Sequence, residues 1–140
     1  MTSTDGVPHF STEAKGTPTA PGRFVKVGDV EPIEFVEGLE FRAVLGEDAM
    51  ANFVTFAPNT TAPLHVHEEE QITIVLDGEF EFTLDGETRT MRAGDVAVIP
   101  PWVPHGAHTV DSTCYEIDVF TPPRRSLLEH ARKQVPNQQD

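Results

Sequence analysis

The sequence has little of several features that mark common protein classes. Its single cysteine, Cys114, excludes an internal disulfide and favours the reducing cytoplasm. The longest apolar runs, such as 72–76, are far too short to span a bilayer. The first ten residues hold no basic patch followed by an apolar stretch, so we expect no secretory signal. These absences predict a cytoplasmic protein with no membrane partner.

Positive charge is also scarce. The chain has 10 Lys and Arg residues against 23 Asp and Glu residues, a formal net charge of -13. Such a chain repels nucleic acid and anionic membranes, so we expect neither as a partner. The motifs GxGxxG, the P-loop and GxSxG are missing as well, so no dinucleotide-binding, nucleoside-triphosphatase or serine-hydrolase function is indicated.

The length and the composition predict one domain preceded by an arm. A chain of 140 residues is long enough for one hydrophobic core but not for two. Residues 1–22 are rich in Thr, Ser, Pro and Gly and show no periodicity, which predicts a flexible N-terminal arm. Residues 23–140 are expected to form the single domain.

Short alternating segments separated by turn residues fill most of this domain. We expect hairpin turns at Asp77-Gly78 and Asp85-Gly86 and one short helix over 125–133. Regularly spaced strands without βαβ alternation predict an all-β sandwich or barrel. The predicted strands cover 24–27, 33–35, 39–45, 50–56, 64–67, 71–76, 79–84, 87–92, 96–99 and 112–120.

Three histidines and a glutamine have the spacing of a metal site. His65 and His67 stand two residues apart on a predicted strand, so their side chains share a face. Gln71 begins the next strand, and His105 ends a proline-rich turn. A lone histidine is more often a hydrogen-bonded core or surface residue, but the four together predict one divalent ion with an open position. Ni, Zn, Mn and Fe all accept this ligand set.

The same residues carry a resemblance to the cupin superfamily. Its first motif runs Gly, five residues, His-X-His, three or four residues, Glu, six residues and Gly. This chain has Asn59, His65, His67, Gln71 and Gly78 at those places. Asn tolerates the left-handed backbone that the first Gly adopts, whereas Gln replaces a ligand Glu.

The second cupin motif runs Gly, five residues, Pro-X-Gly, two residues, His, three residues and Asn. Gly94, Pro100 and His105 match it, while Trp102 replaces Gly and Thr109 replaces Asn. The resemblance implies an antiparallel jelly-roll β-barrel and a homodimer. It leaves the function open, because cupins range from isomerases and oxygenases to storage proteins.

The ligand glutamine narrows the chemistry. A neutral Gln oxygen leaves the metal its full dipositive charge, which strengthens Lewis-acid polarisation of a bound oxygen group. Iron oxygenases more often carry a carboxylate, so the change tilts the prediction away from oxygen chemistry. One alternative stays open, because a shift or bulge of one residue would bring Glu70 to the metal in place of Gln71.

A more specific resemblance lies near the C-terminal end. Residues 118–124, DVFTPPR, resemble the DVFTPxR segment of KdgF-type cupins, which linearise 4,5-unsaturated uronates. In that family an Asp, a Phe and an Arg of this segment complete the active site beside the metal. The resemblance carries these roles onto Asp118, Phe120 and Arg124.

The residue types support these roles. Asp118 and Phe120 have the same parity on a strand, and an inward carboxylate is costly unless it is paired or functional. Two prolines stiffen the chain before Arg124, whose guanidinium suits a carboxylate bound by two hydrogen bonds. A surface salt bridge of Arg124 and plain core packing of Phe120 remain alternatives.

The leading prediction is a metal-dependent isomerase or lyase-type enzyme that acts on a small carboxylated sugar. Asp118 would move the proton, Arg124 would orient the carboxylate, and Phe120 would contact the substrate. Trp102 near the barrel mouth would favour a flatter, more apolar substrate, so a polyketide cyclase or a dioxygenase is the alternative. A cupin that binds a small ligand without catalysis is the third.

Overall fold

Strands dominate the structure, a computed structural model that describes residues 8–134. All strand pairings are antiparallel, as expected for the predicted barrel. The elements are a short 3-10 helix η1 (Val27–Asp29), β1 (Ile33–Val36), β2 (Leu39–Leu45), β3 (Met50–Phe56), β4 (Thr61–His65), β5 (Glu70–Leu84), β6 (Glu87–Arg92), β7 (Val96–Ile99), β8 (His105–His108), β9 (Cys114–Thr121) and α1 (Arg125–Gln134).

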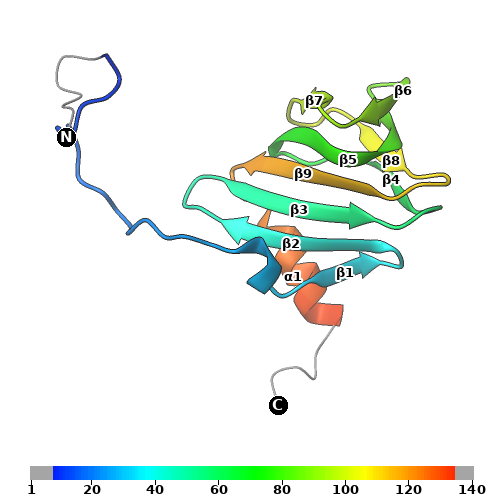
Figure 1. The fold of residues 1–140 in the computed structure, drawn as a ribbon, viewed down its shortest axis with the longest axis horizontal. Helices are drawn as coiled ribbons and strands as arrows, with labels where there is room; N and C mark the ends of the chain where they lie inside the picture. The colour runs from blue at the N-terminus through cyan, green and yellow to red at the C-terminus, as the bar shows by residue number, and fades with distance from the viewer. Residues whose placement is uncertain (1–7, 135–140) are drawn as a thin grey trace.

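The strands form one curled half-barrel. Neighbouring strands run in the order β1, β2, β3, β9, β5, β8 and β4, and β6 and β7 pair with opposite halves of β5 (Figure 1). The strand β5 therefore joins the two ends of the barrel wall. Its first half pairs with β7 and β9, and its second half with β6 and β8.

The predicted hairpin at Asp77-Gly78 is wrong. The chain does not turn back there, because β5 continues unbroken from Glu70 to Leu84. Gly78 has a φ of 74°, and the pairing with β9 shifts register between Val75 and Asp77. The Asp-Gly pair therefore marks a bulge that bends one long strand from one half of the barrel to the other.

The other predicted hairpin turn is confirmed. Asp85 and Gly86 join β5 to β6 with φ angles of 48° and 86°, as a two-residue hairpin turn requires. Gly94 turns between β6 and β7 with a φ of 93°. Asn59 takes a φ of 53°, so it does adopt the left-handed conformation expected at the first glycine of the motif.

Three strand predictions need correction. Residues 24–27 form no strand, and the 3-10 helix η1 begins at Val27. The strand β4 covers 61–65 and ends before His67, because its partner β8 begins at His105, the residue that pairs with His65. The strand β8 was not predicted at all, since its four residues, His-Gly-Ala-His, lack the branched and aromatic side chains typical of strands.

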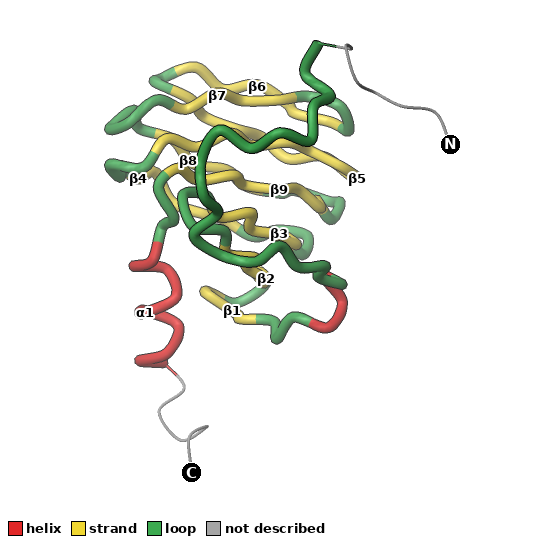
Figure 2. The backbone as a smooth tube through the Cα atoms, turned by 90° about the vertical axis from the view of Figure 1, so that its left-hand side faces the viewer, coloured by secondary structure: helices red, strands yellow, loops and turns green. Residues whose placement is uncertain are grey.

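The hydrophobic core fills the concave side of the half-barrel. It includes Phe41, Met50, Phe80, Ile99 and Phe120, each at most 3% exposed. The predicted helix is confirmed as α1, which contacts β1 and buries Leu127 against the core. Figure 2 shows that α1 lies beside the strands and forms no separate helical layer.

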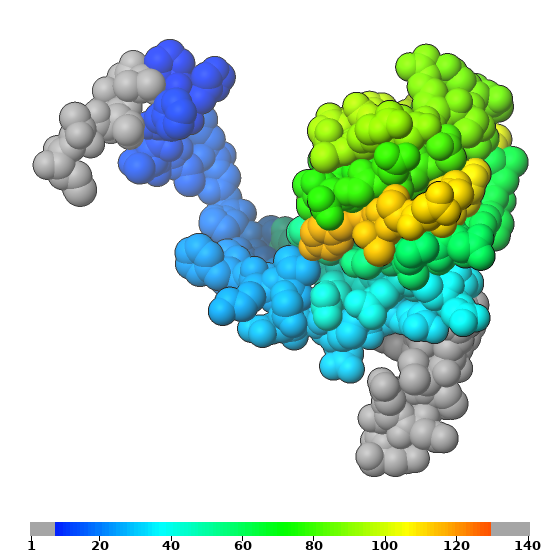
Figure 3. Space-filling model, turned by 45° about the vertical axis from the view of Figure 1, so that its right-hand side comes forward, coloured from blue at the N-terminus to red at the C-terminus, as the bar shows by residue number. Residues whose placement is uncertain are grey.

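The chain before β1 lies outside the barrel. Residues 8–26 contain no strand and are almost entirely exposed, and Figures 1 and 3 show this segment standing away from the body of the molecule. Thr19 donates a hydrogen bond to Glu47, and Arg23 donates one to the carbonyl of Leu45. Residues 1–7 of the predicted arm and 135–140 of the predicted domain lie outside the described residues. Within the described part of the chain, no helix is long and apolar enough to cross a membrane.

Candidate metal centre

Strand pairing brings the three predicted histidines together. His65 ends β4 and His105 begins β8, and these two residues are direct partners in the pairing of the strands. Their ring centroids lie 4.3 Å apart, and that of His67 lies 4.8 Å from His105. The ligand atoms of all three lie within 4.8 Å of one another, a cluster that could hold a metal ion.

Backbone carbonyls fix which ring nitrogen of each histidine carries the proton. Nδ1 of His65 lies 2.7 Å from the oxygen of Pro63, Nδ1 of His67 lies 3.0 Å from that of Glu69, and Nδ1 of His105 lies 2.9 Å from that of Val103. A carbonyl oxygen only accepts, so each Nδ1 donates. Each Nε2 is then left with a lone pair, the usual arrangement of metal-binding histidines.

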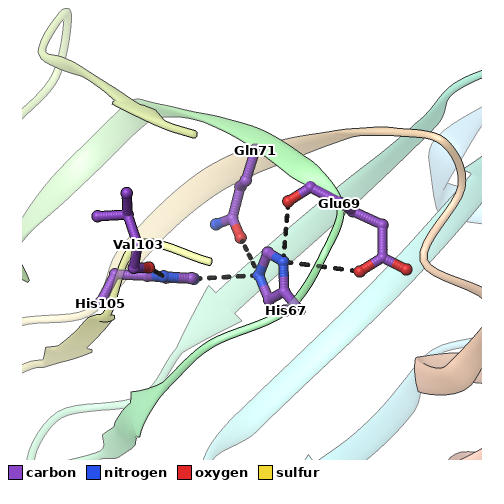
Figure 4. Close-up of polar contacts among 5 residues, drawn as sticks. All are labelled: His67, Glu69, Gln71, Val103 and His105. Atoms are coloured by element: carbon purple, nitrogen blue, oxygen red, sulfur yellow. Dashed lines mark hydrogen bonds and ion pairs between the residues drawn. The ribbon is translucent and has the colours of Figure 1, made fainter. Parts of the chain in front are cut away.

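These lone pairs converge on one point, as Figure 4 shows for His67 and His105. Nε2 of His67 lies 3.2 Å from Nε2 of His105 and 3.0 Å from Oε1 of Gln71. Three atoms that all accept cannot satisfy one another, whereas a cation satisfies them together. Ligand atoms about 2.1 Å from a shared ion stand roughly 3.0–3.4 Å apart at octahedral or tetrahedral angles. The donor set therefore fits a divalent metal.

Gln71, not Glu70, faces this centre. The two neighbours alternate on β5, so that Gln71 is buried and Glu70 is exposed. The amide Nε2 of Gln71 donates to Oγ1 of Thr73 over 2.9 Å, which turns Oε1 toward the histidines. The bulge observed in β5 lies further along the strand, after Val75, so it does not bring Glu70 to the metal centre in place of Gln71.

The surroundings keep the histidines neutral. Burial lowers the pKa of His65 and of His67, and it lowers the pKa of His105 to about 4. Hydrogen bonds from Nδ1 to the backbone act in the opposite direction, and the charge of Arg124 adds to the lowering. Neutral imidazole is the form that binds a metal, so the cluster is prepared for an ion near neutral pH.

A cavity of about 330 Å³ opens beside the cluster, and it is lined by His65, Gln71 and His105. Asp118, Phe120 and Arg124 line the same cavity. Asp118 faces inward as predicted, and its Oδ1 accepts a hydrogen bond of 2.8 Å from Thr73. A continuous chain of hydrogen bonds thus links Gln71, Thr73 and Asp118.

Arg124 reaches the cavity from the chain between β9 and α1. Its guanidinium carbon lies 5.7 Å from the ring centroid of Phe120, a cation–π contact. Burial lowers the pKa of Arg124, and the carboxylates of Glu69 and Asp118 counter that effect. Nε of Arg124 is buried and has no partner among the described residues, so it is available to an anionic ligand. Arg124 therefore does not take the alternative role of a surface salt bridge.

Phe120 serves the core and the site together. It is 1% exposed and its ring packs edge-on against His67, with 5.7 Å between centroids. The backbone of Trp102 contacts that of His67, and its contact with a substrate stays a prediction. Trp102 is 63% exposed and is not among the described residues that line the cavity. Its φ is 68°, and its N–H donates a hydrogen bond of 2.9 Å to the carbonyl of His67.

The sequence reasoning missed two polar residues of the cavity, Asn52 and Glu116. Both line the cavity, at 3% and 2% exposed, and each has a side-chain oxygen without a partner among the described residues. Strand parity could have revealed Glu116, because it shares a face with Asp118 and Phe120 on β9. Asn52 gives no such signal on its own, since only the pairing of β3 with β9 sets it opposite Asp118.

A half-barrel of antiparallel strands with a histidine cluster at its mouth defines a class of small barrel proteins that bind a metal and a small molecule. The chain belongs to the cupin family. Residues 52–120 match the family model described as Cupin domain. The structure of KdgF from Halomonas sp. is similar, with 31% sequence identity and a TM-score of 0.72, and the match covers 76% of this chain and 99% of that one.

Two further comparisons frame the function. The pectin degradation protein KdgF of Dickeya dadantii is 29% identical over 97 residues, which cover 68% of this chain and 88% of that protein. The polyketide cyclase RemF of Streptomyces resistomycificus has 25% identity and a TM-score of 0.66, and the match covers 74% of this chain and 81% of RemF. Because these two relatives are named for the degradation or the cyclisation of small molecules or polymers, they support an enzyme-like function for this cupin.

Other curated relatives are much longer than the matched region. The match spans 37% of the length of a cupin-domain oxidoreductase from Hypocrea virens and 38% of that of an isomerase from Bacillus subtilis. This chain therefore spans well under half the length of those two proteins.

Proposed function

We propose that the protein is a metal-dependent isomerase that opens the ring of a 4,5-unsaturated uronate, in the manner of KdgF-type cupins. The observation that carries the proposal is the shared cavity. One space of about 330 Å³ holds two of the three histidines, Gln71, an inward carboxylate and an arginine with an unpartnered nitrogen. That volume is at the small end of the range for ligand sites, which suits a single sugar acid.

His65, His67, His105 and Gln71 would hold one divalent ion, of nickel, zinc, manganese or iron. When bound, the ion supplies Lewis-acid polarisation of a substrate oxygen. Arg124 binds the substrate carboxylate, because its buried Nε lacks another partner and a guanidinium matches a carboxylate by two hydrogen bonds. Phe120 packs beneath the guanidinium and holds its plane in place.

Asp118 moves the proton. Ring opening transfers the proton of the C1 hydroxyl to C4, while the bond from C1 to the ring oxygen breaks and C5 becomes a ketone. The substrate and the product are therefore isomers, and one group that accepts and returns a proton suffices. Thr73 donates to one oxygen of Asp118 and so orients the carboxylate toward the cavity.

The apolar side chains that line the cavity favour a second candidate function. Phe41, Phe56, Phe80 and Phe82 line it together with Val54. Such a wall suits a flat aromatic substrate, and the likeness to the polyketide cyclase RemF points the same way. A cyclase would use the same metal centre but would not act on a uronate.

Turnover of the unsaturated uronate tests the proposal. The metal-loaded protein should remove the ultraviolet absorbance of the 4,5 double bond, and a chelated sample should not. The Asp118→Asn variant should keep its fold and metal content yet turn over about 10²-fold more slowly, the usual size of a general acid–base contribution. Thr55→Val, an exposed change on the outer face of β3, is the control.

Two results would contradict this proposal. Parent activity in Asp118→Asn would mean that another group carries the proton. No uronate turnover by the parent protein, together with cyclisation of a polyketide, would favour the second candidate.

We also propose a homodimer, supported by the exposed apolar side chains of Phe10 and Phe24 in the segment that stands away from the barrel. Light scattering of the protein and of a variant lacking residues 1–22 tests this, with a smaller particle expected for the variant.

A further inference from the structure

The inner face of the sheet carries more polar groups than the proposed reaction uses. Asn52, Asp118 and Thr73 stand side by side on β3, β9 and β5, because Asp118 pairs with Asn52 on one side and with Thr73 on the other. Glu116 lies two residues before Asp118 on the same face of β9, in the next row of the sheet. A polar strip therefore continues past Asp118, on the side away from Gln71.

Two oxygen atoms of this strip are buried without a partner. Asn52 is 3% exposed and Glu116 is 2% exposed, and both line the cavity. Oδ1 of Asn52 and Oε1 of Glu116 accept no hydrogen bond from any described residue. Leaving a buried polar atom unpaired costs about 1–3 kcal/mol, so two such atoms facing one cavity indicate a ligand that donates to them.

The environment of Glu116 decides which hydrogen-bonding role it plays. Burial first, and then the charge of Asp118 and a hydrogen bond with it, raise the pKa of Glu116 well above its usual value. A neutral Glu116 donates its proton to Asp118 through one oxygen and presents the other as a carbonyl-like acceptor. Asn52 Oδ1 is an acceptor too, so this part of the cavity takes hydrogen-bond donors.

We propose that Asn52 and Glu116 form a hydroxyl-binding subsite that selects substrates with free ring hydroxyls. This inference rests on the proposed function, because a uronate bound by Arg124 at its carboxylate carries hydroxyls on the far side of its ring. Rows of side chains on one face of a sheet lie about 7 Å apart. Asn52 shares the row of Asp118 and Glu116 stands one row further from Gln71, so a sugar ring centred over Asp118 has its hydroxyls within reach of both side chains. The subsite interrupts the apolar lining of the cavity, beside Val54, and disfavours a substrate that lacks hydroxyls.

Binding of two unreactive ring acids tests the subsite apart from turnover. Galacturonate has the hydroxyls and the carboxylate but no 4,5 double bond, whereas tetrahydropyran-2-carboxylate has the ring and the carboxylate alone. Calorimetry on the nickel-loaded protein should show tighter binding of galacturonate. Asn52→Leu and Glu116→Leu should each weaken galacturonate about tenfold, the cost of a lost hydrogen bond near 1.4 kcal/mol, and leave the hydroxyl-free acid unchanged.

Glu116→Gln is the sharpest variant. Its amide keeps an oxygen acceptor and donates an N–H to Asp118, so it should hold galacturonate within about twofold of the parent protein. Thr55→Val, on the outer face of β3, should change neither affinity. Melting temperature and nickel content of each variant show whether the fold and the metal centre are intact.

The possible outcomes separate the subsite from the proposed function. A parent protein that binds both acids equally, or an Asn52→Leu variant that keeps the preference, overturns the subsite even if uronates are turned over. If Asn52→Leu and Glu116→Leu abolish the preference for galacturonate, the subsite is supported. This holds even if the protein isomerises no uronate and the proposed reaction is wrong.

Discussion

Among single residues, Gln71 carries the main departure from the cupin ligand pattern. Its side chain is buried with Oε1 near His67, whereas the neighbouring Glu70 is exposed on the opposite face of β5. Gln71→Ala should therefore lower the metal content per chain, and Glu70→Ala should leave it nearly unchanged. Elemental analysis of both purified variants checks this, and metal loss in Glu70→Ala alone would show that the register of the site differs from that described.

Glu116 links the cavity to stability. Burial, the neighbouring Asp118 and the thiol of Cys114 all raise the pKa of Glu116, so the folded state holds its proton more tightly than the unfolded chain. Stability from this group is complete below the unfolded pKa near 4.5 and falls as the pH rises toward the folded value. The slope is at most about 1.4 kcal/mol per pH unit.

Glu116→Gln removes this titration. We expect the variant to be more stable than the parent protein at neutral pH and to match it more closely near pH 4, because only the parent has to bury or protonate a carboxylate as the pH rises. Urea unfolding of both proteins at several pH values measures the difference. Parallel curves for parent and variant across the whole range would show that Glu116 titrates normally.

Among the elements, β5 depends most on one backbone position. Gly78 has a φ of 74°, and a Cβ placed there would lie 2.0 Å from the carbonyl oxygen of Thr113. Gly78→Ala adds a steric clash with backbone to the cost of a left-handed alanine, so it should destabilise the protein by about 3 kcal/mol or more. The bend that carries β5 between the two halves of the barrel cannot form without that approach.

Gly86 provides the matched control for this prediction. It also has a positive φ, 86°, but a Cβ there meets no atom within 4 Å. Gly86→Ala should therefore cost only the left-handed conformation, about 1–2 kcal/mol. Denaturant unfolding of both variants separates the cost of the steric clash from the cost of the left-handed conformation. Equal losses in the free energy of unfolding would mean that Thr113 moves aside at little cost.

For the whole molecule, metal binding and folding are expected to be coupled. His65 and His67 lie at the end of β4 and just after it, whereas His105 lies on β8, so an ion that the three share binds the folded chain and not the unfolded one. Free metal at 100 times its dissociation constant should add about 2.7 kcal/mol to stability. Calorimetry should show a melting temperature that falls on chelation and returns when nickel or zinc is added.

Two histidine variants locate this effect. His105→Ala should abolish the response of the melting temperature to metal, because it removes one Nε2 of the cluster. His108→Ala, an exposed change three residues further along β8, should keep the full response. A response that survives in His105→Ala would place the metal elsewhere on the molecule.

Features that depend on neighbouring residues follow from the sequence alone. Apolar and polar side chains along the strand predicted β2 and β3 within their observed bounds, because the strand period is a local property, and the turns on either side predicted the bounds of β6. Asp85-Gly86 predicted its hairpin for the same reason, since a two-residue turn is decided by the residues in it. The spacing of His65, His67, Gln71 and His105 singled out the residues that the barrel then brought together.

Features that depend on partners distant in the chain follow from the fold and not from the local sequence. Asp77-Gly78 has the composition of a turn, but pairing with β9 and the contact of Gly78 with Thr113 make it a bend in β5. The link from Thr73 to Asp118 joins residues 45 positions apart, and Asn52 reaches the same row through β3. Cross-strand register sets these contacts, and register depends on how whole strands align, which no short stretch of sequence specifies.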